Sequence, residues 1–391
     1  MKLKLRHLRH PLQTANAAKA LVEARLKRRR FADRSERYFA DDPRYDVQSV
    51  IDGFADRVDD RSDDAALLGR ICTSYIKAAK QEQSAPKAYR PTGWWEQQRH
   101  GSLGAVTKAL MTRDIDALQA MYRNFYRDPC SAGLVVLQSM SKDYFGGTIR
   151  ESHRRFYLAD ALYRIDHWKA QTGSSFNSRD LSGPEIGNPF GVMVEGTLIR
   201  SGAEYQHYCA LRIRRLLAPE RAVVAEIGGG FGGMAYYLLR DRARTTYINF
   251  DVPESVALMS YYLLKAFPQL KFLLYGEEEL SADAIAHADG VLMPVFELAK
   301  MPVDAVDVTF SSHAMSDLSH EAMGEYLKTV ASMTRDSFLY IGNDKSGDVI
   351  SDLITQQYPS FRLAETRTSG WHSHRAPGSS EVECLYRIDG V

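Results

Sequence analysis

The spacing of apolar residues divides the chain into two regions. Between residues 64 and 170, apolar residues recur three and four positions apart, and the alternation typical of strands is absent. This spacing predicts an all-helical region, with helices over 65–77, 103–111, 115–126 and 156–168. Residues 171–184 are rich in Ser, Gly and Asn, which predicts a linker. We therefore expect two domains, a helical N-terminal region over 1–180 and a second domain over 181–391.

Strand and helix signals alternate in the second domain, after a helix expected over about 203–217. Apolar runs predict strands, and the segments between them have helical spacing. Such alternation predicts a Rossmann-like α/β fold, a parallel sheet covered by helices on both faces. The last two runs predict an antiparallel hairpin. The expected strands are 222–227, 245–251, 271–275, 290–295, 305–310, 337–341, 361–366 and 381–388, and the helices are 234–240, 253–267, 280–288, 319–334 and 348–358.

A glycine-rich turn, GGGFGG, follows the first expected strand of this sheet. Glycines permit positive φ and let a bulky ligand approach the main chain without meeting a Cβ. Gly228, Gly230 and Gly232 form the GxGxG pattern of S-adenosylmethionine methyltransferases, whereas Gly233 completes the GxGxxG pattern of nicotinamide and flavin enzymes. Asp251 ends the next strand and suits both ligands, because a carboxylate can hold a ribose diol. The glycines alone leave both ligands open.

Two further features favour S-adenosylmethionine. Glu226 precedes the first glycine, where a carboxylate would repel the pyrophosphate of a dinucleotide and attract the cationic end of S-adenosylmethionine. The hairpin expected over 361–388 is also more typical of a methyltransferase sheet than of a dinucleotide-binding sheet. The alternative is that the glycines only let a helix pack close to a strand.

Composition excludes several classes of protein. A net charge of +1 over 391 residues gives no overall field for nucleic acid. The four cysteines form no CxxC pair, which argues against a disulfide framework or a zinc site and favours the cytoplasm. The first residues are charged, without the apolar stretch of a secretory signal, and no apolar run is long enough for a transmembrane segment.

Charge is uneven near the N-terminus. Residues 1–37 carry twelve Lys and Arg against three acidic residues, and residues 38–64 carry nine Asp and Glu against three Arg. One interpretation is that the two segments neutralise each other on a solvated surface. The other is that the basic stretch 25–30 makes a peripheral contact with anionic lipid or polymer. The sequence leaves this choice open, as it does the question of homo-oligomers.

Several segments resemble the bacterial sugar O-methyltransferases of the class I S-adenosylmethionine-dependent fold. These segments are 185–189, 224–233, 247–255, 261–268 and 309–315. The resemblance covers roughly 180–345 well and the helical half more loosely. It implies S-adenosylmethionine as cofactor, a sugar or glycoconjugate as acceptor, and a methyltransferase sheet. By the same resemblance, Glu226 and Gly228–Gly230 would line the methionine part of the cofactor and Asp251 its ribose.

The adenine contact departs from the usual methyltransferase pattern. An Asp or Glu often follows the third strand, but this chain has Pro294 and Val295 there. We expect backbone groups near Val295 to hold the adenine and Phe296 to pack on it, with Glu297 as a fallback. Ser311 is also expected at the cofactor.

Transfer to a hydroxyl requires a group that accepts the hydroxyl proton. His313 follows the strand over 305–310 and is the expected general base, with Asp317 orienting it. A histidine that caps the next helix or bonds the cofactor is the competing explanation. A divalent metal at Asp344 is a rival route that we do not favour, because that position offers one clear carboxylate.

Acceptor contacts are expected from aromatic and histidine side chains on two elements. A loop contributes Trp371, His372 and His374, and the helix over 203–217 contributes His207 and Tyr208, which could instead face the core. Adjacent Trp94 and Trp95 lie in an expected turn and could stack on a sugar, although burial of at least one is the commoner outcome.

These residues together predict a cytoplasmic S-adenosylmethionine-dependent O-methyltransferase acting on a sugar or glycoconjugate. The helical N-terminal region would cover the acceptor site or mediate oligomerisation. The alternatives are a methyltransferase for a non-sugar small molecule and a non-catalytic scaffold that binds S-adenosylmethionine.

Overall fold

An eight-stranded sheet forms the centre of the molecule. The computed structural model describes residues 11–58, 63–135, 144–145, 147–173, 175–316, 318–375 and 381–388, apart from some side chains at the start of the first helix. The strand order is β5-β6-β4-β3-β7-β8-β10-β9. The strands are β3 (Ala222–Ile227), β4 (Thr245–Asp251), β5 (Phe272–Leu274), β6 (Gly290–Pro294), β7 (Val306–Ser312), β8 (Thr334–Asn343), β9 (Phe361–Thr368) and β10 (Glu381–Ile388).

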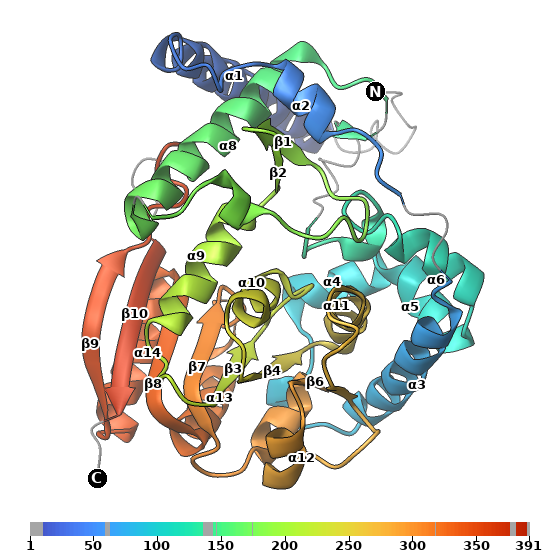
Figure 1. The fold of residues 1–391 in the computed structure, drawn as a ribbon, viewed down its shortest axis with the longest axis vertical. Helices are drawn as coiled ribbons and strands as arrows, with labels where there is room; N and C mark the ends of the chain where they lie inside the picture. Colours follow the sequence, from blue (N-terminus) through green and yellow to red (C-terminus); the bar gives the residue numbers. More distant parts are fainter. Residues whose placement is uncertain are drawn as a thin grey trace.

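The direction of the last strand defines the type of sheet. The pairs from β5 to β8 are all parallel, whereas β10 lies between β8 and β9 and is antiparallel to both. A parallel α/β sheet that ends in such an inserted hairpin is the class I methyltransferase fold. The predicted fold class is therefore confirmed, with the hairpin at the left edge of the sheet in Figure 1.

Helices cover both faces of this sheet, as predicted. One buried cluster joins one face to α9 (Ala203–Arg214), α10 (Gly233–Asp241) and α11 (Pro253–Ala266). The other cluster joins the opposite face to α12 (Ala282–His287), α13 (His320–Met333) and α14 (Asp344–Gln357). Local sequence sets the helix starts, because Pro253 opens α11 and the Ser319 and Asn343 side chains cap α13 and α14.

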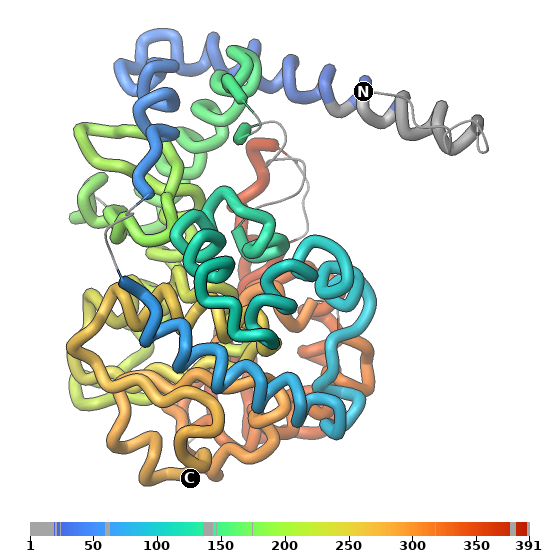
Figure 2. The backbone as a smooth tube through the Cα atoms, turned by 90° about the vertical axis from the view of Figure 1, so that its right-hand side faces the viewer, coloured from blue at the N-terminus to red at the C-terminus, as the bar shows by residue number. Residues whose placement is uncertain are grey.

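The N-terminal region packs onto the sheet domain rather than standing apart from it. Its core residues, such as Leu68 and Trp168, belong to the same buried cluster as Val224 of β3. Figures 1 and 2 show this region above and beside the sheet, with α1 projecting from the top. Its helices are α1 (Pro11–Tyr38), α2 (Gln48–Gly53), α3 (Ala65–Glu82), α4 (Gly93–His100), α5 (Gly104–Thr112), α6 (Ile115–Tyr122) and α8 (Glu151–Thr172).

The segment expected to be a linker is packed. Leu181 is fully buried in a short 3-10 helix (Ser178–Leu181), and its carbonyl accepts a hydrogen bond of 2.8 Å from the Tyr237 hydroxyl. Residue 180 lies within this 3-10 helix, and the buried core continues across it. None of the helices in the described part of the chain is long and apolar enough to cross a membrane.

Some elements differ from those expected. The basic N-terminal stretch belongs to the long helix α1, and the tryptophans expected in a turn lie in the first turn of α4. A two-stranded antiparallel sheet, β1 (Gly191–Val194) and β2 (Thr197–Arg200), precedes α9 and is not among the expected elements. The chain reverses at Glu195 and Gly196, both with positive φ.

Candidate active site

The glycine turn lies between β3 and α10, at the carboxyl edge of the parallel strands. Gly228, Gly230 and Gly232 have φ values of 81°, 61° and 90°, whereas Gly233 is absent from the positive-φ residues. The GxGxG spacing thus matches the conformation of the turn. A Cβ on Gly228 would lie 2.0 Å from the Ala314 Cβ, so this glycine also lets the segment after β7 approach. The positive φ expected from the three glycines is confirmed.

Glu226 is buried beside this turn. Its side chain is 3% exposed, and the Tyr247 hydroxyl donates a hydrogen bond of 2.5 Å to it. Burial raises the pKa of Glu226 to about 8, since the hydrogen bond from Tyr247 offsets burial only in part and the nearby charge of Asp251 adds to it. A cationic ligand would favour the ionised carboxylate, whereas an anionic pyrophosphate would oppose it.

Asp251 ends β4 and supports the turn. It accepts hydrogen bonds from the Gly230 amide at 2.8 Å and the Val252 amide at 2.7 Å. Burial raises its pKa to about 7, despite these two bonds. Asn249 also contacts the turn, accepting the Gly229 amide at 3.1 Å, and its buried Nδ2 has no hydrogen-bond partner in the described part of the chain. The cradle therefore combines closely packed glycine backbone, open only at Gly230, with carboxylate oxygens that can accept hydrogen bonds from a diol.

The expected adenine wall follows β6 at the same edge. Val295 and Phe296 are buried at the start of a 3-10 helix, and the Phe296 ring meets the edge of Tyr275 at 5.5 Å. The Glu297 carboxylate lies 2.7 Å from the Lys300 ammonium, so the fallback residue is already engaged. The Ser311 hydroxyl donates to the Ile227 carbonyl at 3.0 Å and thereby joins β7 to β3.

His313 stands at the end of β7, close to the glycine turn. It has a φ of 63°, and its amide donates to the Ile341 carbonyl at 2.8 Å. Its side chain is 49% exposed, and its Nε2 lies 2.8 Å from Glu381 Oε1. This contact leaves Nδ1 as the ring nitrogen able to take a proton from a bound hydroxyl.

Glu381 is the neighbour of His313 that sequence reasoning missed. It is the first residue of β10 and pairs in register with Asn343 at the end of β8, so an antiparallel strand brings it to the carboxyl edge. Burial raises the pKa of Glu381, but the contact with His313, the hydrogen bond from Ser369 and the charges of His313 and His372 lower it overall. Asp317, the expected partner of His313, lies outside the described residues. The sequence signal that could have identified Glu381 is its position as an acidic residue at the start of a strand antiparallel to 334–343.

The loop after β9 contributes less to the site than expected. Trp371 is 1% exposed and packs against the rings of Tyr205 and Tyr208, both at 5.2 Å. His374 Nε2 lies 2.7 Å from Asp160 Oδ1, which ties the loop to α8. The structure places both side chains in the interior, packed against α8 and α9, and not at a surface where an acceptor could contact them.

His372 is the loop residue that stays close to the site. Burial lowers its pKa first, and nearby Arg164 lowers it further, whereas the charge of Glu381 acts in the opposite direction. His372 therefore shares the electrostatic surroundings of the His313 pair.

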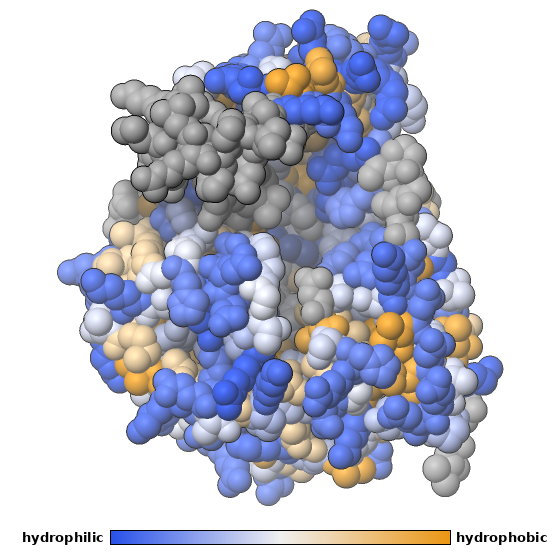
Figure 3. Space-filling view, turned by 180° about the vertical axis from the view of Figure 1, so that it is seen from behind, coloured by the Kyte–Doolittle hydropathy of each residue, from blue (hydrophilic) through white to orange (hydrophobic). Residues whose placement is uncertain are grey.

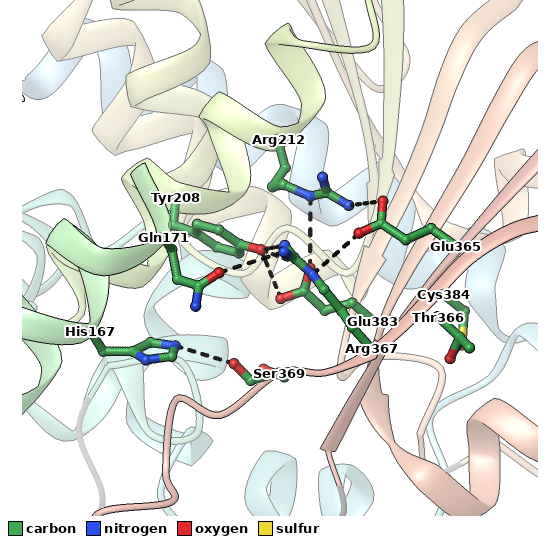
Figure 4. A network of polar contacts seen from close by, with 10 residues as sticks. All are labelled: His167, Gln171, Tyr208, Arg212, Glu365, Thr366, Arg367, Ser369, Glu383 and Cys384. Atoms are coloured by element: carbon green, nitrogen blue, oxygen red, sulfur yellow. Dashed lines mark hydrogen bonds and ion pairs between the residues drawn. The ribbon is translucent and has the colours of Figure 1, made fainter. Parts of the chain in front are cut away.

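The two helix residues expected at the acceptor also lie in the interior. Trp168 donates to His207 Nδ1 at 3.1 Å, and burial lowers the pKa of His207 to about 4. The Tyr208 hydroxyl donates to the buried Glu383, which Arg367 Nε also contacts at 3.0 Å, as Figure 4 shows. This network braces α9 against the hairpin, so the core interpretation of both residues fits and the acceptor interpretation does not.

The structure offers little support for a metal site at Asp344. The described residues contain no group of three His, Cys, Asp or Glu side chains suited to a metal ion. Asp344 is the first residue of α14, where its carboxylate accepts the Lys345 amide at 2.8 Å, and the preceding Asn343 caps the helix.

The helical region borders the glycine turn. A Cβ on Gly230 would lie 3.7 Å from Leu134, and a Cβ on Gly133 would lie 2.6 Å from the Trp94 ring. Trp94 is 48% exposed, whereas Trp95 packs against the core. Arg99 holds α4 in place through ion pairs with Glu82 and with Glu254 near the start of α11. The exposed Trp94 is therefore linked to the glycine turn through Gly133 and its neighbour Leu134.

The strand order and the glycine turn together define the class of protein, a class I methyltransferase fold. No protein-family model matches the chain, and no curated protein matches it. Neither comparison supports the sugar O-methyltransferase family in particular.

Solved structures similar to this chain include several methyltransferases. Magnesium protoporphyrin IX methyltransferase from Synechocystis PCC 6803, with bound S-adenosylmethionine, is 12% identical with a TM-score of 0.35, over 59% of this chain and 97% of its own. TrmN from Thermus thermophilus is 13% identical with a TM-score of 0.35, over 51% and 56%. The pyocyanin biosynthetic protein PhzM is 14% identical with a TM-score of 0.33, over 56% and 64%. Such low TM-scores carry no argument, so the class rests on the strand order.

Proposed function

We propose that this protein is an S-adenosylmethionine-dependent methyltransferase that methylates a hydroxyl of a sugar or glycoconjugate. The observation that carries the proposal is the pairing of two features at one edge of the sheet. One is a positive-φ glycine cradle flanked by Glu226 and Asp251, and the other is the His313–Glu381 pair.

The residues of the cradle fit S-adenosylmethionine better than a dinucleotide. Glu226 and Asp251 are buried carboxyls whose raised pKa values would fall towards normal beside a cationic ligand. In this proposal Asp251 accepts hydrogen bonds from the ribose, Gly228–Gly230 and Glu226 line the methionine part, and Val295 and Phe296 border the adenine. The cofactor, when bound, supplies an activated methyl group on a cationic sulfur.

His313 acts on the acceptor in this proposal. Its Nδ1 takes the hydroxyl proton, while Glu381 holds Nε2 and stabilises the protonated ring. The half-exposed ring leaves room for an acceptor beside it. Glu381 is a positioning residue, since it acts through His313.

The sugar assignment rests on Trp94. Its exposed ring lies beside Gly133, whose neighbour Leu134 meets the glycine turn, so an acceptor could stack there next to the cradle. Pyranose C–H faces pack well on aromatic rings. The resemblance of the sheet domain to sugar O-methyltransferases points to the same acceptor class.

Binding and transfer experiments test the two halves of the proposal separately. Calorimetric titration with S-adenosylhomocysteine and with NAD should show binding of the first alone, and binding of NAD alone would overturn the donor assignment. Incubation with methyl-labelled S-adenosylmethionine and cellular glycan and small-molecule fractions should place the label on a sugar oxygen. Label on a non-sugar molecule would correct the acceptor class, and loss of transfer on chelation would favour the metal route.

A further inference from the structure

Helix α1 has two faces with different surroundings. One face packs on α8, where Phe31 and Ala32 are buried and the Phe31 ring meets Phe156 at 5.3 Å. The opposite face is exposed, and α1 projects from the body of the molecule in Figure 2. Its exposed basic residues are Lys19, Arg25, Lys27, Arg29, Arg30, Arg34 and Arg37, which we call the α1 basic face.

The acidic residues described after α1 form their ion pairs elsewhere. Asp42 forms its ion pair with Arg44 at 2.5 Å, and Asp64 pairs with Lys265 at 2.8 Å. Arg29 is 80% exposed, and its Asp33 contact is long, at 3.9 Å. Among the described contacts, none joins the α1 basic face to residues 38–64. The seven exposed basic side chains of α1 outnumber its exposed acids, Glu23 and Glu36, so the described part of this face carries a net positive charge towards solvent.

Apolar side chains share the exposed side of α1. Val22 and Leu26 are 54% and 48% exposed, and they lie one turn apart on the helix. A period of 3.6 residues places Arg29 and Arg30 on the same side one turn further on. Figure 3 shows a small apolar patch among hydrophilic residues at the top of the molecule. Cations around exposed aliphatic groups are typical of helices that lie in a bilayer interface.

We propose that the α1 basic face docks the protein on an anionic lipid bilayer. Arg and Lys side chains contact the lipid phosphates, and Val22 and Leu26 enter the boundary between headgroups and acyl chains. Nucleic acid offers the same phosphate charge but nothing for two exposed aliphatic side chains to enter, so the observations favour the bilayer. This inference is independent of the proposed function.

Vesicle sedimentation of the full chain tests this surface. We expect binding to vesicles of equal parts phosphatidylglycerol and phosphatidylcholine at low salt, and release at about 0.5 M salt, where the Debye length is only a few ångströms. The triple variant R25E/R29E/R30E should weaken binding about 100-fold, because each cation near an anionic surface contributes about a factor of five to ten. The variant R25K/R29K/R30K keeps the charge and should bind as the unmodified chain does.

Two further variants separate this surface from net charge and from nucleic acid binding. K80E/K87E/K328E makes the same charge change at exposed lysines of other elements and should leave vesicle binding within about threefold. V22S/L26S should weaken vesicle binding about tenfold. Thermal midpoints equal to that of the unmodified chain establish that each variant is folded.

Three outcomes would overturn the proposal. The first is equal binding to pure phosphatidylcholine, and the second is unchanged binding of the R25E/R29E/R30E variant. The third is tighter binding of the unmodified chain to a single-stranded RNA oligonucleotide than to the anionic vesicles, together with unchanged affinity of the V22S/L26S variant for both. Failure in any of these leaves S-adenosylhomocysteine binding untouched, so it is distinct from failure of the proposed function.

Discussion

The two sides of the glycine turn hold their buried carboxyl groups in different ways. On the donor side, formed by Glu226, the glycine turn and Asp251, pKa values are raised to about 8 and about 7, and no described ion pair involves either carboxyl. On the acceptor side, formed by His313 and Glu381, the carboxyl has the chain's own histidine beside it and its pKa is lowered. On the proposed donor side the two carboxyls thus have no cationic partner among the described residues, whereas on the proposed acceptor side His313 lies beside Glu381.

This difference predicts opposite responses to mutation. Removing a carboxylate from the donor side should weaken ligand binding and relieve a cost to stability. Removing a partner from the acceptor side should reduce turnover and leave cofactor binding alone.

The largest effect is expected from His313→Ala. We expect kcat for methyl transfer to fall about 10²- to 10⁴-fold, because the acceptor hydroxyl loses its general base. The Kd of S-adenosylhomocysteine should stay within about twofold, since His313 belongs to the acceptor side. His287→Ala, on an exposed histidine of α12, is the matched control. Turnover within tenfold of the unmodified chain would remove His313 from the mechanism.

Glu226→Gln should weaken binding of S-adenosylhomocysteine about 30- to 100-fold at pH 8.5, because the neutral amide no longer attracts the ligand's amino group. Calorimetric titration measures this Kd.

The unmodified chain should itself bind S-adenosylhomocysteine more weakly as pH falls from 8.5 to 6, since both donor carboxyls become protonated over that range. Equal affinity at both pH values would show that the donor side does not rely on ionised carboxylates.

The Glu226→Gln variant should stabilise the ligand-free protein in alkaline solution. The folded pKa of Glu226 lies above its ordinary value of 4.5, so its contribution to stability is present below pH 4.5 and is lost as pH rises through about 8. Glu226→Gln should therefore raise the free energy of unfolding by about 4 kcal/mol at pH 8.5 and change it by less than about 1 kcal/mol at pH 5. Urea unfolding at the two pH values measures this difference, and a loss of stability at pH 8.5 would contradict it.

Glu381→Gln should lower kcat about tenfold and move the acid limb of the pH–rate profile to lower pH. The amide holds the ring but no longer stabilises its protonated form. A purely structural role would leave the pH profile unmoved. Glu325→Gln, at an exposed position of α13, is the matched control.

The smallest effect is expected at the edge of the acceptor site. Trp94→Ala should raise KM for a sugar acceptor about fivefold without changing kcat, because stacking contributes to binding alone. Trp94→Phe should restore most of the loss. Tyr38→Ala, which removes an aromatic ring that is 68% exposed on α1, is the control for general surface effects. An unchanged KM would argue against a stacked sugar.

Local sequence predicted the sheet domain closely because its signals are short-range. Pro253 opens a helix, β-branched runs form buried strands, and Gly228, Gly230 and Gly232 adopt positive φ where side chains would be strained. Parallel pairing then brings Asp251 and His313 to the edge that carries the turn. The glycine turn and the residues at the neighbouring strand ends could therefore be placed from the sequence alone.

The histidine and aromatic candidates show that local sequence signals do not predict whether a side chain is buried or exposed. His207 and Trp371 have the residue types of a binding site, but their elements pack inward and bury them to 1% exposure. Nothing in their sequence neighbourhood distinguishes a buried ring from an exposed one, because burial depends on which distant helix covers them. The same holds for Trp94 and Trp95, adjacent in sequence and different in exposure.

By itself, the sequence determined the fold class, the glycine turn and its two flanking carboxylates. Each depends on residues that are neighbours in the chain or on strands that follow one another. Only the tertiary structure decided that Glu381 meets His313 and that α1 leaves a basic face exposed. These outcomes join segments tens to hundreds of residues apart, and their partners are set by the packing of the whole core rather than by any local preference.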